Sequence, residues 1–138
     1  MGTLTGRALT QVHQDFTTAN GARAGVQKVI ILITDGQASD IVHLPSENIR
    51  KQGVLISAVG VANYNLQQLN DIASGGKFVA TVEQFDAMDS IRDKVLDAVC
   101  QAQQKRGQDI KQEINNGLQY LKRMLGALED ELEQETKK

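Results

Sequence analysis

Two short runs of apolar, largely β-branched residues limit what this chain can fold into. The first covers residues 28–34 (KVIILIT) and the second covers residues 54–61 (VLISAVGV). Neither run has the length of a typical helix, and neither alternates apolar with polar residues. Both therefore predict strands that are buried on both faces of a sheet. The Asp35-Gly36 pair predicts a turn where the first strand ends.

Helical patterns alternate with these strands. Apolar residues recur at helical spacing in residues 6–19 and 66–74. A short helix is expected over residues 46–52, with Ser46 as its cap and Gly53 as its stop, and a long helix over residues 83–103. A third strand is expected over residues 77–80. Strands that alternate with helices predict an α/β fold with a doubly wound, Rossmann-like parallel sheet. Three strands make only part of such a sheet, because these domains normally have about five or six.

The pattern changes to a seven-residue repeat after Gly107. Apolar residues then follow at alternating steps of four and three, as in a coiled coil. These seam residues are Ile114, Leu118, Leu121, Leu125, Leu128 and Leu132. We therefore predict a first domain over residues 1–103 and an amphipathic helix over residues 104–138 that forms a coiled coil. The alternative is a single helix that packs on its own domain.

Charge and composition exclude several classes of function. The formal net charge is -2, and neither part of the chain is basic enough to predict nucleic-acid binding. No window approaches the roughly 18 apolar residues of a membrane-spanning helix, and the opening residues lack the apolar core of a secretory signal. Five acids crowd residues 129–135, which indicates a solvated helix face or, less commonly, an interaction surface.

The sequence also argues against an enzyme. It contains no phosphate-binding loop, no dinucleotide-binding glycine pattern and no nucleophile elbow. His13 and His43 have no nucleophile or metal partner at motif spacing, so both are expected to be surface or packing residues. Cys100 is the single cysteine, and its spacing leaves three roles open: a buried apolar residue, a reactive thiol, or half of a disulfide to another segment.

Several segments together resemble the second half of a von Willebrand factor type A domain. They are residues 2–9 (GTLTGRAL), 21–23 (GAR), 28–36 (KVIILITDG), 53–61 (GVLISAVGV) and 95–100 (VLDAVC). The resemblance covers about residues 2–100 and is strongest to extracellular matrix members such as the matrilins and the A-domain collagens. It implies a doubly wound parallel sheet that lacks its N-terminal half here, as in a truncated product or partial gene model.

The resemblance also implies a metal-ion-dependent adhesion site at the carboxyl edge of the sheet. By position, Thr3 matches the threonine of that site and Asp35 matches its aspartate. The Asp-x-Ser-x-Ser loop of the family has no counterpart in this chain. Since Mg²⁺ demands near-octahedral oxygen coordination, we expect Mg²⁺ or another divalent cation to bind weakly or not at all to this chain alone. The alternative for Asp35 is an ordinary strand-ending turn residue.

Two further expectations follow from the resemblance. The family places its first strand beside the one formed by residues 28–34, so that strand is expected to have an open, apolar edge that favours self-association. The partner of Cys100 in a disulfide would lie near the missing N-terminal border.

The expected function is a non-enzymatic, extracellular adhesion module. It would bind an extracellular matrix protein such as collagen, and its helix would join copies so that weak sites act together. Two alternatives from other classes remain: a nucleotide-using or hydrolytic α/β enzyme, and a scaffold whose acidic helix is the interaction element.

Overall fold

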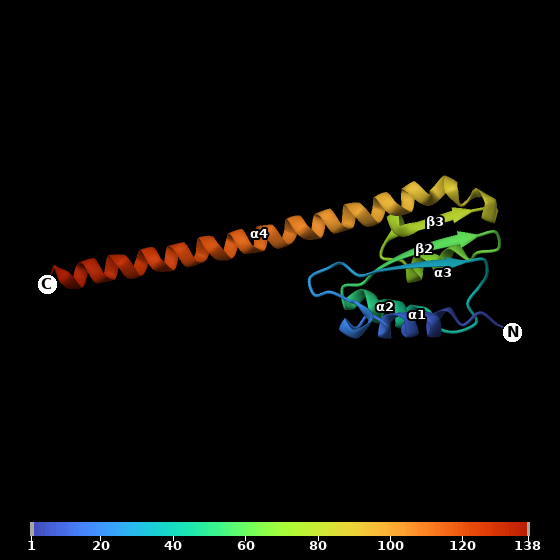
Figure 1. The fold of residues 1–138 in the computed structure, drawn as a ribbon, viewed down its shortest axis with the longest axis horizontal. Coiled ribbons are helices and arrows are strands. Elements are labelled where there is room, and N and C mark those ends of the chain that lie inside the picture. Colours follow the sequence, from blue (N-terminus) through green and yellow to red (C-terminus); the bar gives the residue numbers. More distant parts are fainter. Residues whose placement is uncertain (1, 138) are drawn as a thin grey trace. The chain divides into compact units, whose positions relative to one another are not determined.

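The computed structural model describes residues 2–137 and divides the chain into two compact units, which meet between Gln101 and Ala102. The first unit contains a three-stranded sheet with helices, and the second is helical (Figure 1).

The sheet of the first unit is parallel throughout. Its strands are β1 (Val29–Thr34), β2 (Leu55–Val61) and β3 (Val79–Val82), in the spatial order β1-β2-β3. Val29 pairs with Leu55 and Ala58 pairs with Val79, and both ladders run in the same direction. The structure confirms the predicted parallel α/β fold with a partial, three-stranded sheet.

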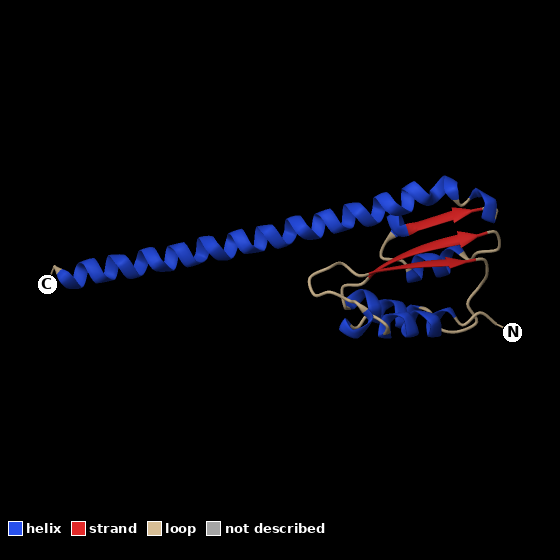
Figure 2. Cartoon of the chain, viewed as in Figure 1, coloured by secondary structure: helices blue, strands red, loops and turns tan. Residues whose placement is uncertain are grey.

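Three helices cover one face of this sheet (Figure 2). They are α1 (Thr5–Gln14), α2 (His43–Lys51) and α3 (Leu66–Ile72); α1 packs on α2, α2 on α3, and α3 on β2. The buried side chains between these layers are Leu9, Ile49, Ile56, Leu69 and Ile72. Gly60 of β2 lies so close to α3 that a Cβ there would stand 2.6 Å from Leu69 Cδ1. The same Cβ would stand 2.6 Å from Tyr64 Cβ, which cannot move aside without its backbone, so the close packing needs glycine at that position.

The first turns of helix α4 (Asp89–Thr136) cover part of the opposite face. Val59, Val61, Ala80 and Val82 form a buried cluster there, and Met88, Ile91 and Val95 pack against it. Strands β2 and β3 are thus enclosed from both sides. This arrangement accounts for the complete burial of β2, as its unbroken apolar run predicted.

The expectation that β1 is buried on both faces is wrong for this structure. Ile30 is buried toward α1–α3, whereas Ile31 and Ile33 on the other face are 50% and 51% exposed. Among the described residues β1 pairs only with β2, so its outer edge is open. An apolar hollow of about 250 Å³ lies beside it, lined by Ile31, Ile33, Val59 and residues of the 88–96 segment.

Several predicted boundaries also need correction. The expected helix over residues 6–19 ends at Gln14, and a separate 3₁₀ turn, η1, covers Thr18–Asn20. Ser46 is not a cap: α2 starts three residues earlier, and the buried Ser46 hydroxyl donates to the Val42 carbonyl at 2.7 Å. Pro45 is tolerated because it lies in the first turn, where its missing N–H has no intrahelical partner.

The third strand and the last helix are displaced in the same way. Residues expected to start a strand at Lys77 form the 3₁₀ turn η2 (Gly76–Phe78), and β3 follows it. Residues 83–88 are not yet α-helical, because the 3₁₀ turn η3 (Phe85–Ala87) precedes α4. Helix α4 then continues without a break to Thr136, through Gly107, Gly117 and Gly126.

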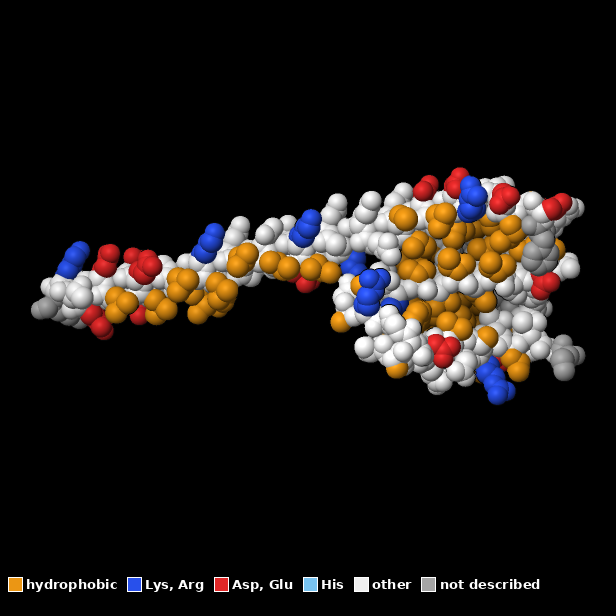
Figure 3. Space-filling model, viewed as in Figure 1, with side chains coloured by type: hydrophobic (Ala, Val, Ile, Leu, Met, Phe, Trp, Pro, Cys, Tyr) orange, Lys and Arg blue, Asp and Glu red, His pale blue; other side chains and the backbone are white. Residues whose placement is uncertain are grey.

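The second unit is one stretch of helix, residues 102–136, whose apolar seam faces solvent. The six seam residues from Ile114 to Leu132 are each between 52% and 63% exposed. Figure 3 shows hydrophobic side chains gathered along one side of this stretch of helix, with Lys and Arg side chains on the opposite side in the same view. No helix within residues 2–137 combines the length and the hydropathy that crossing a membrane requires.

Candidate functional site

Thr3 lies beside the loop that follows β1. It forms an isolated parallel bridge with Ala38, and its carbonyl oxygen accepts hydrogen bonds from the Ser39 backbone N–H at 2.8 Å and the Ser39 hydroxyl at 3.2 Å. Thr3 lies just before α1, so this contact fixes the entry of the chain into that helix. The segment before α1 and the segment after β1 therefore run side by side at the carboxyl edge of the sheet.

Asp35 is the first residue after β1 and is exposed at this same edge. The adjacent Gly36 N–H donates to Thr34 Oγ1 at 3.3 Å, which closes a tight turn. A Cβ built on Gly36 would stand 4.0 Å from Thr3 Oγ1. The structure thus brings the turn that carries Asp35 next to the Thr3 hydroxyl, although 32 positions separate the two residues in the sequence.

Helix α3 holds the 35–39 loop in place through Gln68. The Ala38 N–H donates to Gln68 Oε1 at 3.0 Å, and Gln68 Nε2 donates to the Ala38 carbonyl at 3.3 Å. Gln68 is itself positioned by the helix start, where its own N–H donates to the Asn65 side chain at 3.1 Å. The Gln68 side-chain amide thus hydrogen-bonds both the backbone N–H and the carbonyl of Ala38, as the backbone of a neighbouring strand would.

Asp40 caps the amino end of α1 from a distance of more than 30 residues in sequence. Its carboxylate accepts from the Gly6 N–H at 3.0 Å and the Arg7 N–H at 2.8 Å. A Cβ at Gly6 would overlap the Ile41 carbonyl oxygen, so only glycine permits this approach. Loss of solvent around the Asp40 carboxyl opposes its ionisation, but hydrogen bonds from Gly6, Arg7 and its own N–H outweigh this and lower its pKa.

The oxygen groups expected for a metal site at this edge come from two side chains. Thr3 offers a hydroxyl and Asp35 a carboxylate, whereas the carboxylate of Asp40 is committed to α1. Within residues 2–137 no group of three His, Cys, Asp or Glu side chains stands close enough to hold an ion. Because Mg²⁺ requires about six oxygens in near-octahedral geometry, these two side chains fit a fraction of its coordination shell and not the whole.

The remaining predicted residues belong to helices α1, α2 and α4. Cys100 is an exposed free thiol in α4, so the buried role considered for it is wrong. His43 lies 3.5 Å from Glu47 on the surface of α2, and His13 is in the last turn of α1. The seam residues Ile114 to Leu132 belong to the second unit.

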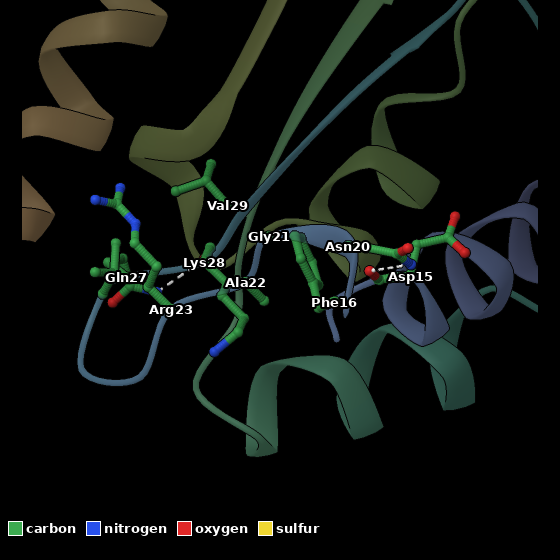
Figure 4. Close-up of a pocket in the computed structure, with 10 residues that line it drawn as sticks. Asp15, Phe16, Asn20, Gly21, Ala22, Arg23, Gln27, Lys28 and Val29 are labelled. Carbon is green, nitrogen blue, oxygen red and sulfur yellow. Dashed lines mark hydrogen bonds between the residues drawn. The ribbon is translucent and has the colours of Figure 1, made fainter. Parts of the chain in front are cut away.

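A second hollow, of about 260 Å³, lies at the opposite end of β1, where the strand begins (Figure 4). Phe16 and Asn20 line one part of it, and Arg23 and Gln27 line another. Asn20 Nδ2 donates to the Asp15 carbonyl at 3.1 Å, and Gln27 Nε2 donates to the Lys28 carbonyl at 2.9 Å. This hollow shares no lining residue with the Thr3–Asp35 edge.

Sequence reasoning missed Gln68, Asp40 and Gly6, which support the candidate site. Each acts through a contact between segments about 30 or more residues apart, whereas periodicity and turn signals report on neighbours in sequence. The single local signal was the short Asp-Gly-Gln-Ala-Ser-Asp stretch after β1, rich in residues that hydrogen-bond backbone in turns.

Comparisons with known proteins agree with this geometry. The family model described as von Willebrand factor type A domain matches residues 1–94. Over 98 residues the chain is 47% identical to the mouse collagen alpha-6(VI) chain, and over 99 residues it is 46% identical to the human collagen alpha-5(VI) chain. These matches cover 71% and 72% of this chain, and the chain spans only about 4% of the length of either collagen chain.

Solved structures show the same fold. Proximal thread matrix protein 1 from the mussel byssus superimposes with a TM-score of 0.69 at 26% identity, over 72% of this chain and 27% of that protein. A form of that protein described as having a zinc-occupied MIDAS motif superimposes with a TM-score of 0.67 at 26% identity, over 70% of this chain and 26% of that one. The parallel sheet and these matches together show that the chain belongs to the von Willebrand factor type A domain family and is of the type found in extracellular matrix proteins.

Proposed function

We propose that this chain is a non-enzymatic protein-binding module of the extracellular matrix. The observation that carries the proposal is the braced carboxyl edge of the sheet, where Ala38 is held by Gln68 and Ser39 by Thr3. These hydrogen bonds fix the loop that follows Asp35 against the segment that carries Thr3, so we expect little ordering entropy to oppose the docking of a partner. The kinship with collagen VI chains supports an extracellular location and a matrix protein such as collagen as the partner.

The metal part of the proposal is limited by the ligand count. Thr3 and Asp35 supply two oxygen groups, and water or a second polypeptide would have to supply the rest. We expect the isolated chain to bind Mg²⁺ with a dissociation constant in the millimolar range or weaker, measured by isothermal titration calorimetry. Micromolar binding that disappears in Asp35→Asn would show that the chain completes the site by itself.

The second unit is proposed to join copies of the chain. Its six exposed seam residues repeat at the spacing that knobs-into-holes packing requires, and they have no partner within residues 2–137. Joining copies multiplies weak binding edges through effective concentration. This proposal includes the division predicted from the sequence, with a binding domain over residues 1–103 and a joining helix over residues 104–138. The open edge of β1 provides a second, weaker route to self-association.

Solid-phase binding to immobilised fibrillar collagen tests the module as a whole. We expect saturable binding of the full chain, reduced at least tenfold when Leu121→Asp and Leu125→Asp remove the avidity of joined copies. The matched control is Gln119→Asp with Ala127→Asp, which adds the same charge off the seam. Absence of saturable binding by the wild-type chain to collagen would overturn the proposed partner, and equal binding by both double variants would overturn the role of the helix.

A further inference from the structure

The exposed seam of the second unit is bounded by two charged residues. Continuing the alternation of threes and fours beyond the six apolar positions reaches Lys111 before Ile114 and Glu135 after Leu132. All these residues lie within the continuous helix α4. The seam therefore has opposite charges at its two ends, at positions that face the partner helix in any two-stranded coil.

Charge is also unequally distributed along the second unit. The acids Glu129, Asp130, Glu131, Glu133 and Glu135 crowd its last turns, whereas residues 102–119 carry three basic residues, Lys105, Arg106 and Lys111, against the acids Asp109 and Glu113. Two parallel helices in register would place the acidic turns of one copy on those of the other. They would also bring Lys111 against Lys111 and Glu135 against Glu135 at the two ends of the seam.

Reversing one helix removes these conflicts and still pairs every apolar seam residue. In one antiparallel register Ile114 faces Leu132 of the second copy, Leu118 faces Leu128, and Leu121 faces Leu125. The same register places Lys111 opposite Glu135 of the second copy, and by symmetry this pair forms twice. Opposite charges that face each other at a helix seam are attractive, and like charges are repulsive.

We propose that two copies of this chain associate through an antiparallel coil formed by residues 111–135. The inference rests on the proposed oligomerisation helix and adds to it the number of copies and their direction. A like-charge contact remains in this register, because Lys122 lies beside Lys122 of the second copy. It flanks the seam, where two flexible, solvated four-carbon side chains can move apart.

Charge reversal in the full chain separates the two directions. In the antiparallel dimer Lys111→Glu sets a new carboxylate against Glu135 of the second copy at both ends of the seam. The resulting repulsion is expected to raise the dimer dissociation constant about tenfold. Glu135→Lys alone is expected to weaken the dimer to a similar degree. Combining Lys111→Glu with Glu135→Lys restores the attraction, and the dissociation constant should return to within about twofold of wild type.

Sedimentation velocity at low ionic strength measures all four proteins, and about 0.5 M salt is expected to shrink the differences among them. A parallel dimer predicts another pattern. In that dimer Lys111→Glu exchanges one like-charge pair for another, and Glu135→Lys relieves the repulsion between the acidic turns, so neither single variant should weaken the dimer as it does in the antiparallel coil. Dimers that the single variants do not weaken would overturn the antiparallel direction and leave the proposed oligomerisation intact. A wild-type chain that stays monomeric at tens of micromolar would overturn both, and a stable trimer would overturn the two-copy coil alone.

Discussion

The Gln68 side chain is predicted to hold the candidate site in shape, and Gln68→Ala tests this directly. The substitution removes two hydrogen bonds, at 3.0 and 3.3 Å, to the N–H and the carbonyl of Ala38. A typical hydrogen bond contributes roughly 0.5–1.5 kcal/mol net. Ala38 is half-buried, so water replaces these contacts only in part. We therefore expect the free energy of unfolding to fall by about 1.5 kcal/mol.

Urea denaturation measures the loss of global stability, and hydrogen exchange measures the loss of local stability at the Ala38 amide. The Ala38 amide should exchange about tenfold faster, because roughly 1.4 kcal/mol corresponds to a factor of ten in the opening equilibrium. The control is Gln67→Ala, which changes the same residue type in the same helix at an exposed position. Equal stability of the two variants, with unchanged exchange at Ala38, would refute the argument that Gln68 braces this edge.

Three further predictions concern the first unit. Gly60→Ala should lower the free energy of unfolding, measured with urea, by about 1–3 kcal/mol, because its Cβ would stand 2.6 Å from Leu69 Cδ1. The control Gly76→Ala has open space around the new methyl group and should lower it far less. Equal losses in the two variants would contradict the packing argument. Asp40→Asn should destabilise the chain most at pH values above the ordinary carboxyl pKa near 3.8, because the hydrogen bonds that lower the pKa of Asp40 favour its ionised form. The difference in stability from wild type should shrink as the pH falls through the lower folded-state pKa. A difference that does not change with pH across this range would count against this cause. Ile33→Lys should reduce the self-association that remains after the Leu121→Asp and Leu125→Asp changes, since Ile33 is 51% exposed on the open strand β1. Light scattering measures this as a fall in average mass. An unchanged mass would remove the β1 edge as an interface.

Local sequence patterns predicted where the strands lie better than they predicted how each strand is buried. The runs at 28–34 and 54–61 became β1 and β2 nearly to the residue, because unbroken β-branched sequence has few other uses at that length. The same pattern was wrong about the burial of β1, since the coverage of Ile31 and Ile33 depends on what packs beside them and not on the run itself. Ser46 was wrong as a cap for a similar reason: the first turn of α2 formed earlier, around Pro45.

The candidate site could be predicted only through family resemblance. Thr3 and Asp35 carry no local signal that would join them, and their proximity depends on the bridge between Thr3 and Ala38. The residues that hold them, Gln68 and Asp40, act across the fold through hydrogen bonds that a single sequence does not reveal.

The capping contact of Asp40 ties the stability of α1 to the loop that carries Asp35. Because the carboxylate that caps this helix belongs to the stretch just after the sheet edge, any force applied at Asp35 reaches the first turn of α1 along the backbone to Asp40 and through the two hydrogen bonds from Gly6 and Arg7 to its carboxylate. That turn begins shortly after Thr3, so both sides of the edge are displaced together. A load on this module would therefore pull the helix start and the strand end as a single mechanical element.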